Sequence, residues 1–219
     1  MIVVHYLPDS RSHRIAWLLE ELELPYEIIT YARIPETRRA PPALKAVHPL
    51  GKGPAITDEG RVIAESGAII DYILRRYGKG RLQPAPSDER YGDYVYWMHA
   101  AEGSVIMHLL VHVFAARANP DAPIMQRLDE EVLNQLDFVN ATLAGRDYLL
   151  GDAFTAADIQ LSFAGDLAAG RFGLQDFPNI AAWVERYRAR PGYRAAISRA
   201  GPLNMRVQHD RPLRRAPQA

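Results

Sequence analysis

The segment from residue 51 to residue 70 restricts the fold of this chain more than any other. It reads Gly-Lys-Gly-Pro-Ala-Ile, a polar turn, Val-Ile-Ala, and then Glu-Ser-Gly-Ala-Ile-Ile. Pro54 has no N–H for a sheet ladder, so it belongs at the start or the edge of a strand. The second strand passes directly into a helix, whose first turn offers free N–H groups and the positive dipole end to an anion. The segment therefore predicts a hairpin and a helix that can hold an extended peptide with a carboxylate.

The residues before this segment complete a small α/β domain. Residues 2–7 are an apolar run short enough for a buried strand, and a helix follows from Ser10. Residues 26–31 have the composition of a second strand, and residues 42–47 suit a short helix. The predicted order is strand, helix, strand, short helix, strand, strand, helix, which is the order of a thioredoxin-like fold. We expect the first two strands to be parallel and the last two to form an antiparallel hairpin.

The rest of the chain has an all-helical pattern. Gly and Pro punctuate residues 79–87, and apolar periodicity then predicts helices over 88–118, 123–144, 156–169 and 178–190, with a short one from 191. The sequence therefore predicts a thioredoxin-like domain over 1–78, a linker over 79–87, an all-helical bundle domain over 88–200 and a tail over 201–219.

Composition excludes several classes of function. The 219 residues hold 26 basic and 26 acidic side chains, whereas a nucleic-acid surface shows a basic excess. We find no leader peptide and expect no run long enough to span a bilayer, so we expect a cytoplasmic protein. The chain has no cysteine, which excludes disulfides, thiolate metal sites and a cysteine nucleophile.

Pro54 and the pair Glu65-Ser66 resemble, in kind and spacing, the signature of the soluble glutathione transferases. The resemblance implies a cis-proline at Pro54, with the backbone of Gly53 pairing with the cysteinyl part of glutathione. It implies that Glu65 and Ser66 bind the γ-glutamyl end, with Ser66 holding the carboxylate. Lys52 is either a partner of the glycyl carboxylate or a solvated loop lysine. Gly53 departs from the family pattern, in which a branched apolar residue is usual.

Conjugation of glutathione needs a thiolate, and a free thiol with a pKa near ~8.5 is mostly protonated at neutral pH. A hydroxyl donor at a helix N-terminus stabilises the anion. Ser10 is the candidate, because the segment from Ser10 to Leu19 resembles the serine-type transferases. Ser12 and Tyr6 are the alternatives, and Arg11 either approaches glutathione or is an exposed helix-start arginine. A cap oxygen accepts whereas catalysis needs a donor, so we expect a serine to combine the two roles badly.

The resemblance extends into the helical half through Glu102-Gly103-Ser104, and the chain looks like a fungal transferase and its bacterial relatives. A second substrate is expected against the first long helix, on side chains that otherwise pack the bundle or a dimer face: Tyr94, Met98, His99, Glu102 and Met107. Thr155 and Asp158 have the spacing of a capping box, which is a structural role. His108 and His112 are four residues apart, but no third ligand is evident, so we expect no metal.

These observations predict a serine-type glutathione transferase that acts on a small hydrophobic electrophile with glutathione as co-substrate. The resemblance also implies a homodimer, and we expect no nucleic-acid partner and no membrane span. Two alternatives remain: a glutathione-dependent peroxidase for organic hydroperoxides at the same site, and a non-enzymatic binding module that keeps the fold. The tail from 201 to 219 is basic and is either a solvated terminus or a cover for the cleft or a partner subunit.

Overall fold

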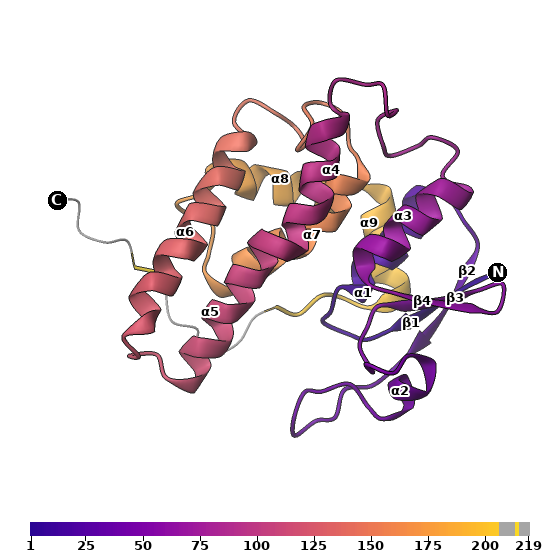
Figure 1. Cartoon of the computed structure of the whole chain (residues 1–219), viewed down its shortest axis with the longest axis horizontal. Coiled ribbons are helices and arrows are strands. Elements are labelled where there is room, and N and C mark those ends of the chain that lie inside the picture. The colour runs from indigo at the N-terminus through magenta and orange to yellow at the C-terminus, as the bar shows by residue number, and fades with distance from the viewer. Residues whose placement is uncertain (206–212, 215–219) are drawn as a thin grey trace. The chain divides into compact units, whose positions relative to one another are not determined.

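The computed structural model describes residues 1–205 and 213–214, which fall into two compact units (Figure 1). The first unit contains Met1–Asp88 and Tyr187–Asn204, and the second contains Glu89–Arg186 and Met205. The predicted boundaries at 78, 88 and 200 stay a prediction. The units differ from them in one respect, because residues 187–204 group with the N-terminal part of the chain rather than with the helical part.

The first unit is built on a four-stranded mixed sheet with the order β2-β1-β3-β4. Strands β1 and β2 run parallel, with Ile2 opposite Tyr26, and β3 runs antiparallel to both β1 and β4. This is the predicted thioredoxin-like arrangement, and the fold class is confirmed. The strands span Ile2–Tyr6 (β1), Tyr26–Thr30 (β2), Ala55–Asp58 (β3) and Arg61–Ala64 (β4).

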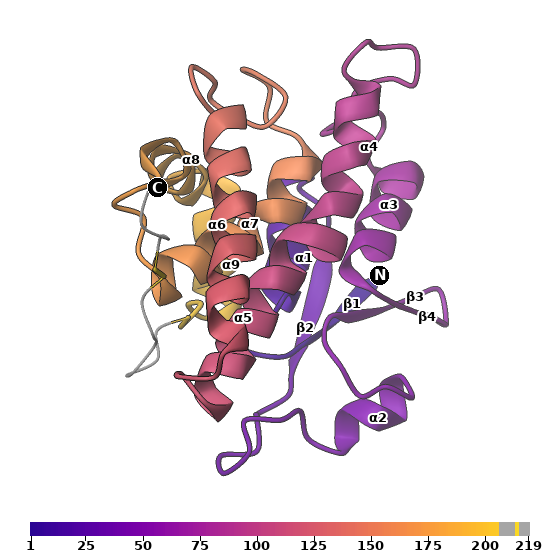
Figure 2. The ribbon, with the colours of Figure 1, turned by 60° about the vertical axis from the view of Figure 1, so that its left-hand side comes forward.

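The helices of the first unit cover both faces of this sheet. Figures 1 and 2 show α1 and α3 on one side and the short α2 on the other. Their bounds are Ser12–Glu21 (α1), Ala43–Val47 (α2), Ser66–Tyr77 (α3) and Pro191–Ala200 (α9). Helix α1 begins at Ser12, two residues later than predicted, because Ser10 lies in the turn that leads into it.

Helix α9 belongs to the first unit because it packs on α1. Both oxygens of Glu21 accept hydrogen bonds of 2.8 Å from the Arg190 guanidinium, just before α9. The ring of Tyr193 lies edge-on to His13 at 4.8 Å and to Trp17 at 5.1 Å between centroids. These contacts join residues more than 160 positions apart in the sequence, so helical periodicity alone did not assign α9 to this unit.

The second unit is all-helical, as predicted. Its helices span Tyr91–Ala100 (α4), Ala101–Ile106 (η1), Met107–Ala118 (α5), Ile124–Thr142 (α6), Ala156–Arg171 (α7) and Pro178–Arg188 (α8), with the last two residues of α8 in the first unit. The predicted single helix over 88–118 is interrupted by the π-helix η1. Helix α7 is buried from Ala156 to Ala168 and forms the centre of the bundle.

Among the described residues, the run from Tyr91 to Ala118 is long and apolar enough to cross a membrane by length and composition alone. The sequence-based expectation that no run meets this criterion was wrong, because the charged residues in this stretch are few. The finding says little about membranes, since core helices of soluble proteins meet the same criterion. In the tail, Arg206, Arg211 and Arg215 lie outside the described residues.

Candidate functional site

The turn that precedes β3 contains a cis peptide bond between Gly53 and Pro54, as the resemblance implies. Pro54 is buried, Gly53 is half-buried and Lys52 is exposed. Residue 55 pairs with His5 of β1, so this turn lies at the same edge of the sheet as the carboxyl end of β1. The proline and the start of α1 therefore meet in space.

Ser10 lies in the turn between β1 and α1 and is 8% exposed. Its hydroxyl donates to the carbonyl oxygen of Leu7 at 2.6 Å, and its oxygen accepts the Ser12 N–H at 3.1 Å. A hydroxyl has one proton to donate and two lone pairs that accept. Ser10 thus accepts and donates at once, and the expectation that a serine combines helix capping with donation to a thiolate badly stays a prediction.

The two alternatives to Ser10 are more deeply buried. Ser12 is 0% exposed, and its hydroxyl oxygen accepts the Leu7 N–H at 3.2 Å. Tyr6 is also 0% exposed, and its hydroxyl has no hydrogen-bond partner among the described residues. Burial, with the nearby charge of Asp9, raises the pKa of Tyr6 to about 12. Of the three hydroxyls, that of Ser10 is the most accessible to a ligand.

The turn before Ser10 is held from two directions. The Arg33 guanidinium donates to the carbonyl oxygens of Pro8 at 2.8 Å and Asp9 at 3.0 Å. The Asp9 carboxylate accepts from Arg38 at 2.7 Å and from the backbone N–H of Asn204 at 2.8 Å. Asp9 has a φ of 53°, in the left-handed region that Asp tolerates better than most residues. These contacts fix the backbone that presents Ser10.

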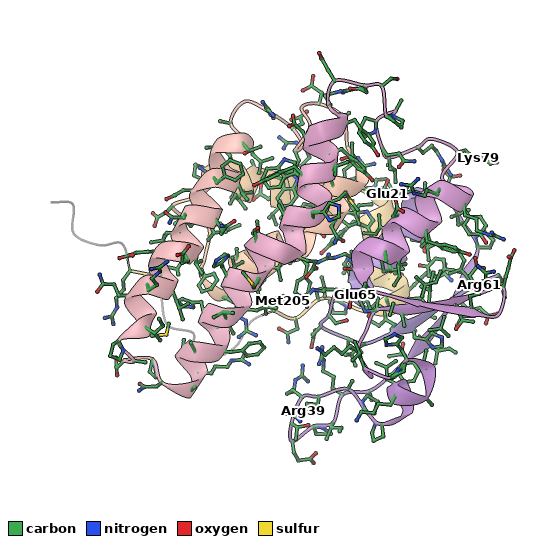
Figure 3. The ribbon with its side chains drawn as sticks, viewed as in Figure 1. Glu21, Arg39, Arg61, Glu65, Lys79 and Met205 are labelled. Atoms are coloured by element: carbon green, nitrogen blue, oxygen red, sulfur yellow. The ribbon has the colours of Figure 1, made fainter. Side chains whose placement is uncertain are left out.

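The first turn of α3 forms the other half of the candidate site. Glu65 precedes the helix with a φ of 70°, and Figure 3 shows it where β4 passes into α3. A bulky residue in this region costs about 1–2 kcal/mol, and such positions cluster at ligand sites. The Glu65 side chain is exposed and does not cap the helix. The first N–H groups of α3 thus remain available to an anion.

Arg14 is the residue that sequence reasoning missed. It lies on α1, is 1% exposed, and donates from Nη1 to the Ser66 hydroxyl at 3.2 Å. Its neighbour His13 is neutral at physiological pH, because burial and the Arg14 charge lower the pKa of His13 to about 4. Arg14 is therefore the cation beneath the α3 N-terminus. Its signal in the sequence is an arginine on the same stripe as Leu18 and Leu22, at intervals of four.

The candidates for binding the second substrate lie in the described part of the second unit. The expected second-substrate residues all lie on the run from α4 to α5: Tyr94 is buried, Met98 and Glu102 are half-buried, and His99 and Met107 are exposed. Half-buried Arg11 belongs to the first unit and is involved in further interactions. Among the described residues, no three His, Asp or Glu side chains group as metal ligands. His112 instead contacts Asp129 at 2.8 Å.

The predicted capping box is present at the start of α7. The Thr155 side chain accepts from the backbone N–H of Asp158, and the Asp158 carboxylate accepts from the Thr155 N–H at 2.9 Å. The same carboxylate accepts from the Leu149 N–H at 3.0 Å and from the Trp183 indole at 3.1 Å. Asp158 thus ties the preceding loop and α8 to the start of α7.

Comparison with known proteins decides the family. Residues 10–76 match the glutathione S-transferase N-terminal domain, and residues 103–191 match the glutathione S-transferase C-terminal domain. The chain belongs to the glutathione S-transferase family. Glutathione S-transferase 3 of Schizosaccharomyces pombe is 37% identical, over 91% of this chain and 88% of the relative. This chain is therefore similar to a fungal protein along almost its entire length.

Solved structures of bacterial glutathione transferases resemble this one. The crystal structure of a glutathione S-transferase from Actinobacillus pleuropneumoniae is 36% identical and has a TM-score of 0.87, covering 94% of this chain and 95% of that one. A family member from Pseudomonas fluorescens, solved with two glutathione bound, is 24% identical with a TM-score of 0.75, over 90% of this chain and 92% of that one. At that identity the second comparison shows the fold alone.

Proposed function

We propose that this protein is a serine-type glutathione transferase in which the Ser10 hydroxyl stabilises the thiolate of bound glutathione. The observation that carries the proposal is the position of Ser10. It lies in the turn that Arg33 and Asp9 fix, and it is less buried than either Ser12 or Tyr6. Its oxygen accepts the Ser12 N–H, and its one proton, now directed at the Leu7 carbonyl oxygen, is the group that it offers to the sulfur. Family membership and the glutathione bound to the Pseudomonas relative support glutathione as the ligand.

The tripeptide has a complementary group for each of its parts. The backbone of Gly53, beside Pro54, pairs with the cysteinyl residue as an added strand would. The γ-glutamyl carboxylate binds the free N–H groups of α3 and the Ser66 hydroxyl, with the buried Arg14 charge beneath them. Glu65 takes the γ-glutamyl ammonium, and exposed Lys52 takes the glycyl carboxylate.

The chemical step requires little from the protein beyond stabilisation of an anion. The thiol proton leaves to solvent, the sulfur forms a bond to the electrophilic carbon, and the leaving group departs with the electron pair of its bond. The Ser10 proton stays on its oxygen and hydrogen-bonds the sulfur, for which it leaves the Leu7 carbonyl. A charge-assisted hydrogen bond of this kind contributes about 1.5–3 kcal/mol, which lowers the thiol pKa by about 1–2 units.

The second substrate and the oligomeric state are further parts of the proposal. A small hydrophobic electrophile binds against the run from α4 to α5, on the residues named above. The same unit exposes several other large apolar side chains, each 46–62% exposed, on α4, α5 and α6: Tyr96, Val111, Phe114, Ile124 and Phe138. Burying such side chains is favourable. A second copy of this chain is the partner we propose for them.

The test is calorimetric titration with glutathione, together with the ultraviolet thiolate absorbance of the complex across pH. We expect Ser10→Ala to bind glutathione while its bound thiol pKa rises by about 1–2 units and kcat/KM at neutral pH falls about 10–100-fold. Ser162→Ala is the matched control, because Ser162 is a buried serine of α7 whose hydroxyl also donates to a backbone carbonyl, that of Ile159.

The outcomes separate the alternatives. An unchanged thiol pKa in Ser10→Ala would assign the stabilisation to another group. A wild-type protein that binds no glutathione would favour the binding-module alternative. Hydroperoxide turnover without conjugation would favour the peroxidase, in which two glutathione molecules supply both electrons because the chain has no cysteine.

A further inference from the structure

Two serine side chains share a short hydrogen-bonded chain at the start of α1. Ser12 Oγ accepts the Leu7 N–H at 3.2 Å and lies 2.9 Å from Ser10 Oγ. Ser10 Oγ lies 2.6 Å from the Leu7 carbonyl oxygen and accepts the Ser12 N–H at 3.1 Å. All of these atoms are buried or nearly so, since Ser12 is 0% and Ser10 8% exposed. Water molecules therefore do not freely rearrange these hydrogen bonds.

The positions of the protons follow from what each atom can do. A carbonyl oxygen only accepts, so the Ser10 proton is the one directed at Leu7. Ser10 has no second proton, and the contact between the two serine oxygens therefore carries the Ser12 proton toward Ser10. The Leu7 N–H thus donates to Ser12, the Ser12 hydroxyl donates to Ser10, and the Ser10 hydroxyl donates to the Leu7 carbonyl oxygen. Ser10 Oγ then accepts two hydrogen bonds, which fills its lone pairs.

Gly53 makes this arrangement sterically possible. A Cβ atom built on Gly53 would lie 2.8 Å from Ser12 Oγ and 2.9 Å from the Leu7 Cβ, closer than Cβ atoms approach their neighbours. The φ of Gly53 is outside the left-handed region, so its backbone does not require glycine. What requires glycine is space for the Ser12 hydroxyl and the Leu7 side chain. The Ser12 hydroxyl is thus one of the two groups that a side chain at residue 53 would displace.

We propose that Ser12 is a positioning residue for the thiolate-stabilising hydroxyl, and that the absence of a side chain at Gly53 leaves room for it. This inference rests on the proposed function of Ser10. By donating to Ser10, the Ser12 hydroxyl fills the second lone pair of Ser10, so Ser10 can meet the sulfur only through its proton, which turns from the Leu7 carbonyl oxygen. Hydrogen bonds in such a chain also polarise one another, by about 10–30% per bond. Ser12 itself does not touch the sulfur, because its oxygen is enclosed.

The first measurement is the pKa of the thiol of glutathione bound at saturation, from its thiolate absorbance across pH. We expect Ser12→Ala to raise this pKa by about 0.5–1 unit, less than Ser10→Ala does, because the direct hydrogen bond to sulfur remains. We expect kcat at neutral pH to fall about 3–10-fold with little change in KM. A merely structural role for Ser12 would lower the melting temperature without moving the thiol pKa, and Ser162→Ala reports that loss alone.

The second measurement uses Gly53→Ala, which keeps the Ser12 hydroxyl but displaces it. We expect it to raise the bound thiol pKa about as much as Ser12→Ala does, and to add no further shift in the Ser12→Ala background. This variant also decides the inference if Ser12→Ala does not fold. Independent, additive shifts, or an unchanged thiol pKa in both variants, would overturn it.

Failure of the inference is distinguishable from failure of the proposed function. A wild-type protein that binds no glutathione, or whose bound thiol has an unperturbed pKa, overturns the role of Ser10 and with it that of Ser12. A lowered thiol pKa that is lost in Ser10→Ala but kept in Ser12→Ala and Gly53→Ala overturns the role of Ser12 alone.

Discussion

Two buried aspartates, one in each unit, show how differently the same side chain is used. Asp58 ends β3 and is 1% exposed, and its carboxylate accepts from the hydroxyls of Tyr72 at 2.8 Å and Tyr77 at 2.5 Å. Asp158 is 0% exposed and accepts from backbone N–H groups, the Thr155 hydroxyl and the Trp183 indole. Both carboxylates hold a helix in place, and both have several donors.

The pKa values of the two carboxyl groups are shifted in opposite directions. Burial disfavours the charge of Asp58, but hydrogen bonds from Tyr77 and Tyr72, with the charges of the chain's amino terminus and Arg76, leave its pKa below the ordinary value. Burial raises the pKa of Asp158 to about 6, and the hydrogen bonds from Leu149, Thr155 and Trp183 offset only part of that rise. Neutral donors surround both carboxylates, so the comparison teaches that the presence of donors alone does not set the direction of the shift. Positive charge from Arg76 and the amino terminus adds to the effect of the donors at Asp58.

The largest expected effect is that of removing the Asp158 carboxylate. Asp158→Ala leaves the Leu149 N–H, the Thr155 N–H and the Trp183 indole buried without their acceptor, and we expect about 3–5 kcal/mol of lost stability. Thermal unfolding measures the loss. Asp152→Ala is the control, because Asp152 is exposed in the same loop and should cost less than about 0.5 kcal/mol.

Calorimetry of the folded Asp158→Ala protein separates stability from binding. We expect its affinity for glutathione to equal that of the wild type, because Asp158 joins the 149–155 loop and α8 to α7 and touches none of the proposed ligands of glutathione. A variant of wild-type stability with lost affinity would contradict the structural role of the capping box.

The next effect in size is a pH dependence. Because the folded pKa of Asp158 is raised, its proton-linked stability is fully present below the ordinary value of 3.8 and is lost as the pH rises through about 6. Asp158→Asn removes this titration. We therefore expect the wild type to gain about 1–3 kcal/mol relative to Asp158→Asn as the pH falls from about 7 to about 4. A difference that does not vary with pH would show that Asp158 is already ionised across this range.

Asp58→Asn should show the opposite pH dependence of stability, and the change in stability should be smaller. A lowered folded pKa contributes stability above the ordinary value of 3.8, and this stability is lost as the pH falls through the folded pKa. We expect the variant to be about 1–2 kcal/mol less stable at neutral pH and equal to the wild type in strong acid. Asp71→Asn, an exposed aspartate on the same helix α3, is the control.

The affinity for glutathione provides a second comparison of the two aspartates. Asp58 holds Tyr72 and Tyr77 of α3, and the first turn of that helix is where we place the γ-glutamyl group. We therefore expect Asp58→Asn to weaken glutathione affinity measurably, whereas Asp158→Ala does not. Equal affinity in both variants would show that the first turn of α3 is fixed by Arg14 and β4 alone.

What the sequence predicted correctly depends on contacts that are close in the chain. Residues close together in the sequence predict the hairpin, the proline at its start and the capping box of Thr155 and Asp158. The order of helices and strands along the chain follows from the same local patterns. The helix after the hairpin was predicted, but the acceptor that its residues Tyr72 and Tyr77 share at Asp58 was not foreseen. Side-chain pairing across 14 or 19 residues leaves no periodic signal.

Sequence reasoning missed contacts between residues that are far apart in the chain, and it missed the directions of the hydrogen bonds around Ser10. Arg14 and Ser66 are 52 residues apart, and Glu21 and Arg190 are 169 apart. Nothing in the sequence shows that Ser12 Oγ lies where a side chain of residue 53 would be. The π-helix η1 was missed because its residues have ordinary helical periodicity.

The smallest expected effects come from the two tyrosines that face Asp58. Tyr72→Phe and Tyr77→Phe each remove one donor, and we expect about 0.5–1.5 kcal/mol of lost stability at neutral pH. The two donors share Asp58 Oδ2, so the double variant should lose more than the sum of the single losses, because in each single variant the remaining donor compensates for the absent one. Unfolding between about pH 2 and 5 measures whether the acid transition moves toward the ordinary aspartate value as the hydroxyls are removed. If it stays where the wild type has it, Arg76 and the amino terminus hold the charge of Asp58, and positive charge rather than donor number separates the two carboxylates.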